Sequence, residues 1–282
     1  MNQFKVKEKY DIQDFINLIS FLRSENGCPW DHVQTHTSIR RNLLEEAFEL
    51  AETIDKDDKV HMKEELGDVM MQVLFHADIE ADAGNFNINA VADSACQKLV
   101  SRHPNLFGEK TQLDWDEIKR LERGERTVSM EMQDVSRTLP SLWRADKIQR
   151  KAAKIGYDWP DVHDALDKIE EEARELRQGV DLMDKDNIIE ELGDLIFATV
   201  DAARILGVDP EAAVHRACEK AIGRFQHMEA LAAGMGKNLE NMSLSEMEDL
   251  HQKARQEREG KTPSYDKMNY FRELEEKRNI KE

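Results

Sequence analysis

An internal repeat constrains this chain more than any other feature of its sequence. The stretch KEELGDV at residues 63–69 returns as IEELGDL at 189–195, which is 126 positions later. The acidic motif EExxE at residues 45–49 returns at 171–175 with the same offset. Two copies that keep one register are typical of a duplicated supersecondary unit. We therefore predict two related halves.

Each half has the sequence pattern of amphipathic helices. Apolar residues recur at steps of three and four, and Asp11 and Asp161 are expected helix starts. The 282 residues include 13 Gly and 6 Pro, few enough to favour long helices over a turn-rich sheet. We predict an all-α protein with a first domain at 1–121, a polar linker at 122–137, a second domain at 138–260 and a tail at 261–282.

The charge balance limits the kinds of partner. With 40 basic and 58 acidic residues the net charge is −18, which opposes the phosphate neutralisation that nucleic-acid binding requires. We therefore expect no nucleic-acid partner. A small triphosphate ligand would need bound cations to reverse the local potential.

The cysteines and the apolar segments indicate the compartment. Cys28, Cys96 and Cys218 lack the paired spacings of zinc sites or disulfide scaffolds, so we expect reduced thiols. The sequence shows no signal-like N-terminus and no apolar run of membrane-spanning length. We expect a cytoplasmic protein without a membrane partner.

Acidic residues in each half are spaced to converge on one side of a helix pair. Like charges one turn apart destabilise a helix by roughly 0.2–0.5 kcal/mol, so two facing clusters call for a compensating cation. Oxygen-only donors suit Mg²⁺. The candidate metal ligands are Glu172, Glu175, Glu191 and Asp194, with a second candidate site at Glu45, Glu46, Glu49, Glu65 and Asp68. A solvated acidic face without metal is the alternative.

Basic residues and glycines accompany these acids. Lys220 and Arg224 lie one turn apart and are candidates for catalysis and substrate binding, with ordinary surface charge as the alternative. Lys98 and Arg102 are the corresponding substrate-binding candidates in the first half. The glycines within the ExxD segments, at positions 67 and 193, are predicted to permit close helix packing.

Taken together, these motifs resemble the MazG family of nucleoside triphosphate pyrophosphohydrolases, in which EExxE is followed by ExxD on a second helix. The resemblance covers nearly the whole chain and includes residues 26–31, 34–35, 102–104, 139–140, 147–149 and 156–159. It implies that helices of two protomers complete each bundle in a homodimer. It also implies Mg²⁺ as cofactor, with Mn²⁺ as a substitute, and hydrolysis of nucleoside triphosphates to monophosphate and pyrophosphate, mainly in the C-terminal half.

Three positions depart from the family pattern. Ala221 replaces an aromatic, Asn187 a lysine and His251 a tryptophan, and these changes bear on substrate contacts. The expected mechanism is attack by water, with metal ions bridging phosphate oxygens. Glu171 and Glu172 are candidate catalytic residues. Of the two, Glu171 is the candidate proton acceptor.

Other classes of protein fit the sequence less well. A di-iron carboxylate bundle needs Glu-x-x-His twice, and only Glu248 with His251 fits. A motor or switch NTPase would need a P-loop, which the sequence lacks. A non-catalytic acidic helical module for protein interaction remains the second hypothesis, which Mg²⁺ binding with pyrophosphate release would separate from the enzyme.

Overall fold

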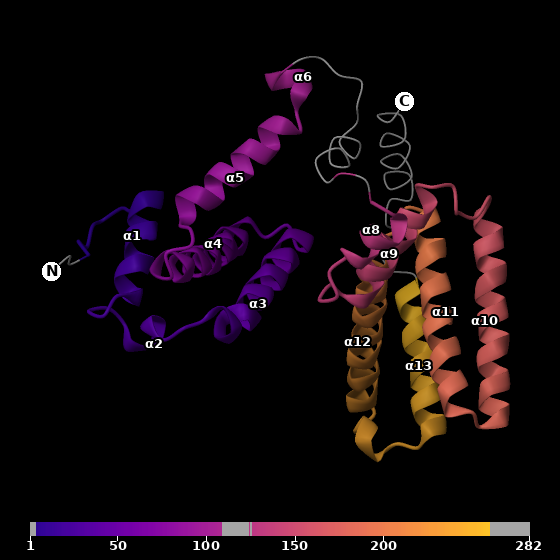
Figure 1. The fold of residues 1–282 in the computed structure, drawn as a ribbon. Coiled ribbons are helices and arrows are strands. Elements are labelled where there is room, and N and C mark those ends of the chain that lie inside the picture. The colour runs from indigo at the N-terminus through magenta and orange to yellow at the C-terminus, as the bar shows by residue number, and fades with distance from the viewer. Residues whose placement is uncertain (1–3, 109–123, 125, 260–282) are drawn as a thin grey trace. The chain divides into compact units, whose positions relative to one another are not determined.

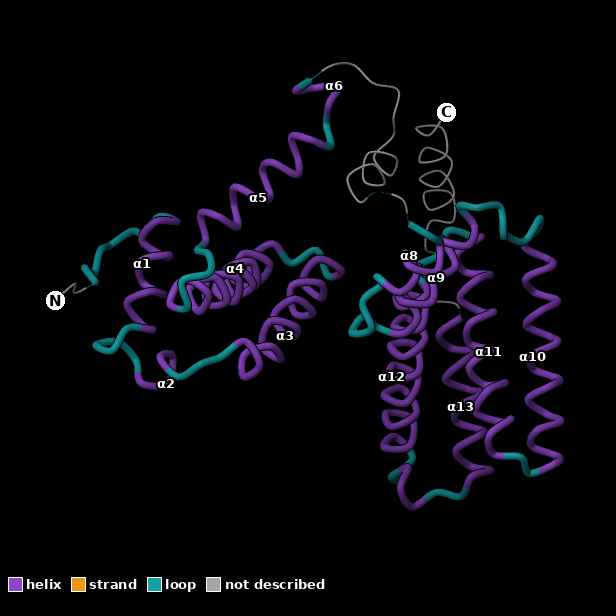
Figure 2. The backbone as a smooth tube through the Cα atoms, viewed as in Figure 1, coloured by secondary structure: helices purple, strands orange, loops and turns teal. Residues whose placement is uncertain are grey.

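The computed structural model describes residues 4–108, 124 and 126–259, and within these ranges it contains helices and no strand (Figure 2). The prediction of an all-α fold is therefore confirmed. The chain divides into two compact units between residues 124 and 125. None of the described helices is long and apolar enough to cross a membrane. The predicted tail at 261–282 lies outside the described residues.

The first unit is built around one helical hairpin. Its helices are α1 (Ile12–Arg23), α2 (Pro29–His32), α3 (His36–Asp55), α4 (Lys59–Asp82), α5 (Ile88–Ser101) and α6 (Pro104–Phe107). Helices α3 and α4 form the hairpin, and α1 packs against α4 (Figure 1). Asp11 starts α1 through a capping box, as predicted. The buried core comprises Ile19, Ile39, Leu74 and Phe75.

The second unit repeats this hairpin and adds a further helix pair. Its elements are α8 (Val128–Gln133), α9 (Ser141–Ala153), α10 (Val162–Leu182), α11 (Lys185–Ile205), α12 (Pro210–Gly234), a 3₁₀ turn (Leu239–Asn241) and α13 (Leu244–Glu259). Helices α10 and α11 form the hairpin, α12 pairs with α13, and α9 contacts both α11 and α12. Asp161 caps α10, as predicted.

The two hairpins share a turn as well as a sequence motif. Asp57 and Met183, which are equivalent in the repeat, both adopt positive φ, at 53° and 55°. The next residues, Asp58 and Asp184, each cap the following helix by accepting bonds from two backbone N–H groups. The same local device therefore fixes how the two acidic helices meet in both units.

Two expectations differ from the structure. The segment predicted as a linker, 122–137, contains α8, which packs on α9 and is joined to it by a 3.0 Å ion pair between Glu131 and Lys151. Apolar residues in this segment are too few to show a helical period. The contacts with α9 stabilise the helix in their place. Close helix packing at Gly67 and Gly193 is not observed within either unit, because an added Cβ would meet no atom within 4 Å.

Candidate metal centre

Each hairpin brings three carboxylates together. In the second unit Glu172 and Glu175 of α10 meet Glu191 of α11, and each offers an oxygen within 4.8 Å of the others. In the first unit the equivalent residues Glu46, Glu49 and Glu65 form the same arrangement. One helix supplies an i, i+3 pair on one face and the returning helix supplies the third acid. These oxygen-only sets are compatible with a hard divalent cation.

The electrostatics of both clusters favour a bound cation. Burial, reinforced by neighbouring carboxylates, raises the pKa of Glu46 and Glu65 above the ordinary glutamate value. Burial likewise raises the pKa of Glu191, although Asn187 opposes this effect. Ionisation of Glu46, Glu65 and Glu191 is thus less favourable than that of a free glutamate, and a divalent cation would offset this cost.

Other predicted acids lie outside these triads. Glu45 forms a 2.7 Å ion pair with Arg41, and Glu171 forms one of the same length with Lys168. Asp68 and Asp194 are not among the three converging groups. Asp194 does line the cavity that adjoins the second triad.

Lys168 is a functional candidate that the sequence analysis missed. Its ammonium lies 2.7 Å from both Glu171 and Glu172, and these bonds raise its pKa. The same contact lowers the pKa of Glu171, which makes that carboxylate a weaker base in this arrangement. The position equivalent to Lys168 in the first unit is Asn42. The spacing of Lys168 to Glu171 and Glu172, i, i+3 and i, i+4, was the sequence signal that could have identified it.

Asn187, one of the positions that depart from the resemblance, contacts the cluster directly. Its Nδ2 donates to Glu191 Oε1 at 2.8 Å. A Cβ at Gly179 would lie only 2.5 Å from Asn187 Oδ1, so this glycine leaves room for the amide between the helices. Asn187 therefore helps to orient one carboxylate of the triad.

The predicted basic residues are more distant from the acids. Lys220 is exposed on α12 and Arg224 is half-buried one turn later. Across the described part of the chain, no ion pair within 4.0 Å joins either of them to the second triad. Lys98 is exposed on α5, and Arg102 is the C-cap residue of that helix. A substrate role for these four residues stays a prediction.

A cavity of about 690 Å³ adjoins the second triad. Glu172, Asp194 and Lys168 line it together with the aromatic residues Trp159 and Phe197. Glu172 is the triad member that lines the cavity, so this carboxylate and the two aromatic side chains face one continuous space.

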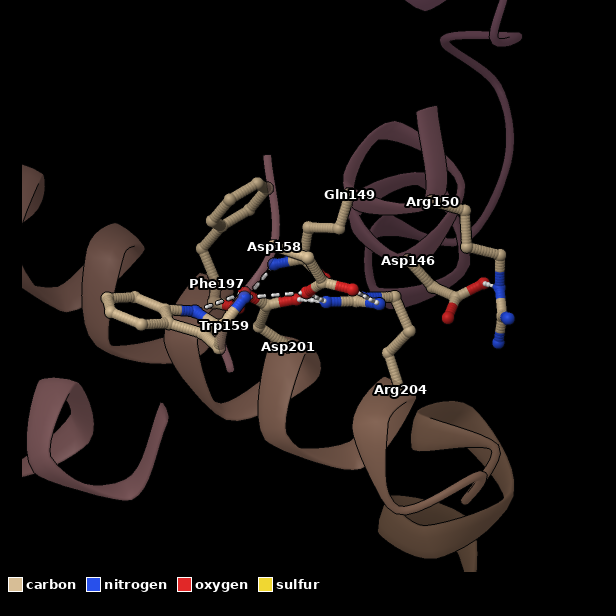
Figure 3. Close-up of polar contacts among 8 residues, drawn as sticks. All are labelled: Asp146, Gln149, Arg150, Asp158, Trp159, Phe197, Asp201 and Arg204. Atoms are coloured by element: carbon tan, nitrogen blue, oxygen red, sulfur yellow. Dashed lines mark hydrogen bonds and ion pairs between the residues drawn. The ribbon is translucent and has the colours of Figure 1, made fainter. Parts of the chain in front are cut away.

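A ring of polar contacts holds the cavity wall (Figure 3). Trp159 Nε1 donates to Asp201 at 2.7 Å, and Arg204 Nε donates to the other oxygen of Asp201 at 2.8 Å. The Arg204 guanidinium also binds Asp158, whose carboxylate accepts the Trp159 backbone N–H. This ring ties the loop after α9 to α11. The sequence analysis missed Asp201 and Arg204, whose i, i+3 spacing is too common to single them out.

Comparison with known proteins places these features in a family. Residues 34–107 and 162–229 match the family model described as the MazG nucleotide pyrophosphohydrolase domain, and these two segments cover more than half of the chain. The chain belongs to the MazG family. Each matched segment contains one acidic hairpin, which agrees with the two-domain resemblance.

Two named relatives match this chain over most of their length, and a third matches about half of it. The chain is 38% identical over 246 residues to the nucleoside triphosphate pyrophosphohydrolase/pyrophosphatase MazG of Thermotoga maritima, covering 86% of this chain and 95% of the relative. It is 35% identical to the nucleoside triphosphate pyrophosphohydrolase of Escherichia coli K12, covering 87% and 97%. A Mycolicibacterium smegmatis enzyme of the same name is 39% identical over 51% of this chain and 46% of its own.

Proposed function

We propose that this MazG-family chain hydrolyses nucleoside triphosphates to the monophosphate and pyrophosphate. The observation that carries the proposal is the convergence of three carboxylates at equivalent positions of two hairpins, each within a MazG segment. The activity named for the two relatives that match over most of their length supports the same reaction.

In this proposal the carboxylates hold Mg²⁺, with Mn²⁺ able to take its place. Glu172, Glu175 and Glu191 form the main site, and Asp194 joins them from the next turn of α11. The first unit offers a second site at Glu46, Glu49 and Glu65, with Glu45 and Asp68 beside it. Bound Mg²⁺ neutralises phosphate charge and makes water more acidic, which is the chemistry that attack on a phosphoanhydride needs.

The remaining roles belong to side chains around the triad. Lys168 places a positive charge beside Glu172, where it can bind a phosphate oxygen. Glu171 stays the candidate proton acceptor, and release of its bond to Lys168 on substrate binding would restore its basicity. Lys220 and Arg224 would approach the phosphates when a second protomer completes the bundle.

A non-catalytic interaction module is the alternative. It would use the same acidic faces to dock a basic partner, and it would neither require a divalent ion nor release pyrophosphate. The recurrence of one triad geometry in both units favours the enzyme, since a docking face does not need side chains at matched positions.

Product analysis tests the proposal. A panel of nucleoside triphosphates with Mg²⁺ should give pyrophosphate and monophosphate as the first products, and EDTA should abolish the reaction. The Glu175→Gln variant should be inactive, whereas Glu190→Gln, from outside the triad, should retain activity. Orthophosphate and diphosphate as initial products would overturn the assignment.

A further inference from the structure

The cavity beside the second triad has the size and lining of a small-molecule site. Its volume of about 690 Å³ is within the roughly 300–1,000 Å³ common for ligand pockets. Trp159 and Phe197 are 39% and 42% exposed, so both rings present surface to a ligand. Such flat apolar surfaces stack on any base, because every base has a π-face.

The aromatic surface is held in place before any ligand arrives. The indole of Trp159 is fixed through Asp201, which in turn is held by Arg204 (Figure 3). The backbone carbonyl of Phe197 accepts a 2.8 Å bond from the buried side chain of Gln149. A ligand that stacks here would lose little free energy in ordering the protein.

The first unit has a different interior at the equivalent place. Phe75 takes the position of Asp201, and it is buried with Ile19 and Leu74 in the apolar core. Met71 takes the position of Phe197 and packs against that core. The two units therefore share the carboxylate triad but not the polar ring that frames the cavity.

We infer that the cavity of the second unit binds the nucleoside part of the substrate, with the base stacked on Trp159 and Phe197. The assignment rests on the proposed function, because it takes the phosphates of the same ligand to lie at the triad. Continuity between the two regions supports it, since Glu172, Asp194 and Lys168 line the cavity. Asp201 and Arg204 act as positioning residues for Trp159.

Calorimetric binding of two matched ligands tests the inference. Adenosine monophosphate and ribose 5-phosphate share a sugar and phosphate, and only the former carries a base. With full-length protein in EDTA, we expect tighter binding of adenosine monophosphate. Trp159→Ala should weaken that binding about tenfold and leave ribose 5-phosphate unchanged. Trp30→Ala, at an exposed tryptophan of the first unit, should change neither.

A second variant guards against a local folding effect. Phe197→Ala removes the other aromatic surface and keeps the backbone carbonyl that binds Gln149, so it should also weaken adenosine monophosphate selectively. Unchanged affinity in both variants, equal affinity of the wild type for the two ligands, or an equal loss in Trp30→Ala would overturn the inference. Because these measurements need neither metal nor turnover, failure of the proposed reaction would appear separately, as absence of pyrophosphate release.

Discussion

Single residues distinguish the two carboxylate triads. Glu172 is only 5% exposed and has the Lys168 ammonium beside it, whereas its counterpart Glu46 is half-buried and the position of Lys168 is taken by Asn42. Charges interact more strongly where water is excluded. We therefore expect the second triad to be the better of the two at holding a cation together with a phosphate.

The two ExxD aspartates test this ranking. Asp194→Asn removes one negative charge and keeps the shape, so we expect weaker Mg²⁺ binding and a loss of turnover by orders of magnitude. Asp68→Asn should reduce turnover much less. Steady-state pyrophosphate release at several Mg²⁺ concentrations would measure both effects.

Circular dichroism should show the same helix content in both aspartate variants, because a folding defect would mimic loss of metal. If Asp68→Asn abolishes activity and Asp194→Asn spares it, the roles of the units are reversed. The working site would then be Glu45, Glu46, Glu49, Glu65 and Asp68, served by Lys98 and Arg102.

Removing one charge from the second triad should stabilise the metal-free protein. The pKa of Glu191 is raised by burial, so the folded state binds more protons than the unfolded state, and stability falls as the pH rises through the carboxyl range. Glu191→Gln mimics the neutral acid, so in EDTA at neutral pH its Tm should exceed that of the wild type. The increase in Tm on adding Mg²⁺ should shrink.

Glu190→Gln is the matched control for this melting experiment, since Glu190 is the neighbouring acid on α11 and lies outside the triad. Its Mg²⁺-dependent shift in Tm should equal that of the wild type. A lower Tm for Glu191→Gln in EDTA would contradict the proposed repulsion within the triad.

At the level of elements, the helical hairpin is the repeated device, and the first one carries an additional pair of histidines. His36 of α3 and His76 of α4 stack, with their Nδ1 atoms 2.7 Å apart, and His36 Nε2 lies 2.6 Å from Glu80. In this contact one Nδ1 must donate a hydrogen bond and the other must accept it. The two imidazoles therefore cannot be protonated at the same time. We therefore expect these residues to link the two helices of the hairpin in a pH-dependent way.

Acidification should therefore weaken the first unit. Burial, then the charge of His36, lowers the pKa of His76, so the unfolded state binds more protons and stability falls as the pH drops below about 6.5. The Tm of the wild type should fall between about pH 7 and pH 5.5, and His76→Gln should reduce this dependence. An equal pH dependence in the variant would show that the histidine pair does not couple the helices.

Across the whole molecule, each hairpin leaves an apolar surface uncovered. Ile189, Leu192 and Ile196 of α11 are 62%, 46% and 46% exposed, and Leu66, Met70 and Val73 of α4 are also exposed. Gly67 and Gly193 lie within these surfaces and contact nothing that would exclude a Cβ. Exposed apolar patches of this kind mark protein interfaces. A second copy of the chain is the occupant we propose.

An isologous dimer should therefore form through the hairpins. Sedimentation should give a dimer mass, and Leu192→Asp should shift it toward the monomer with loss of activity, because a charge would be buried at the interface. Leu244→Asp, at an exposed leucine that begins α13, should leave the dimer intact. Monomeric mass with full activity at nanomolar protein would contradict the dimer.

Much of the fold could be predicted from the chain alone. The offset of 126 identified the duplication, and apolar periodicity identified the helices, because both are local properties of consecutive residues. The same spacing indicated which acids share a helix face, and the structure brings three of the predicted acids of each half together. Which acids bind metal stays a prediction.

The tertiary structure decided what lies beside those acids. The cavity depends on Gln149 from α9, Trp159 from a loop and Phe197 from α11, and no local pattern relates residues so far apart. The repeat alone shows that Phe75 in the first half corresponds to Asp201 in the second. It does not show that Phe75 is buried while Asp201 binds Trp159, because burial depends on which neighbours pack around a position. Sequence spacing thus determined the paired helices and their acidic faces. Long-range packing determined that one unit holds an apolar core where the other holds a cavity.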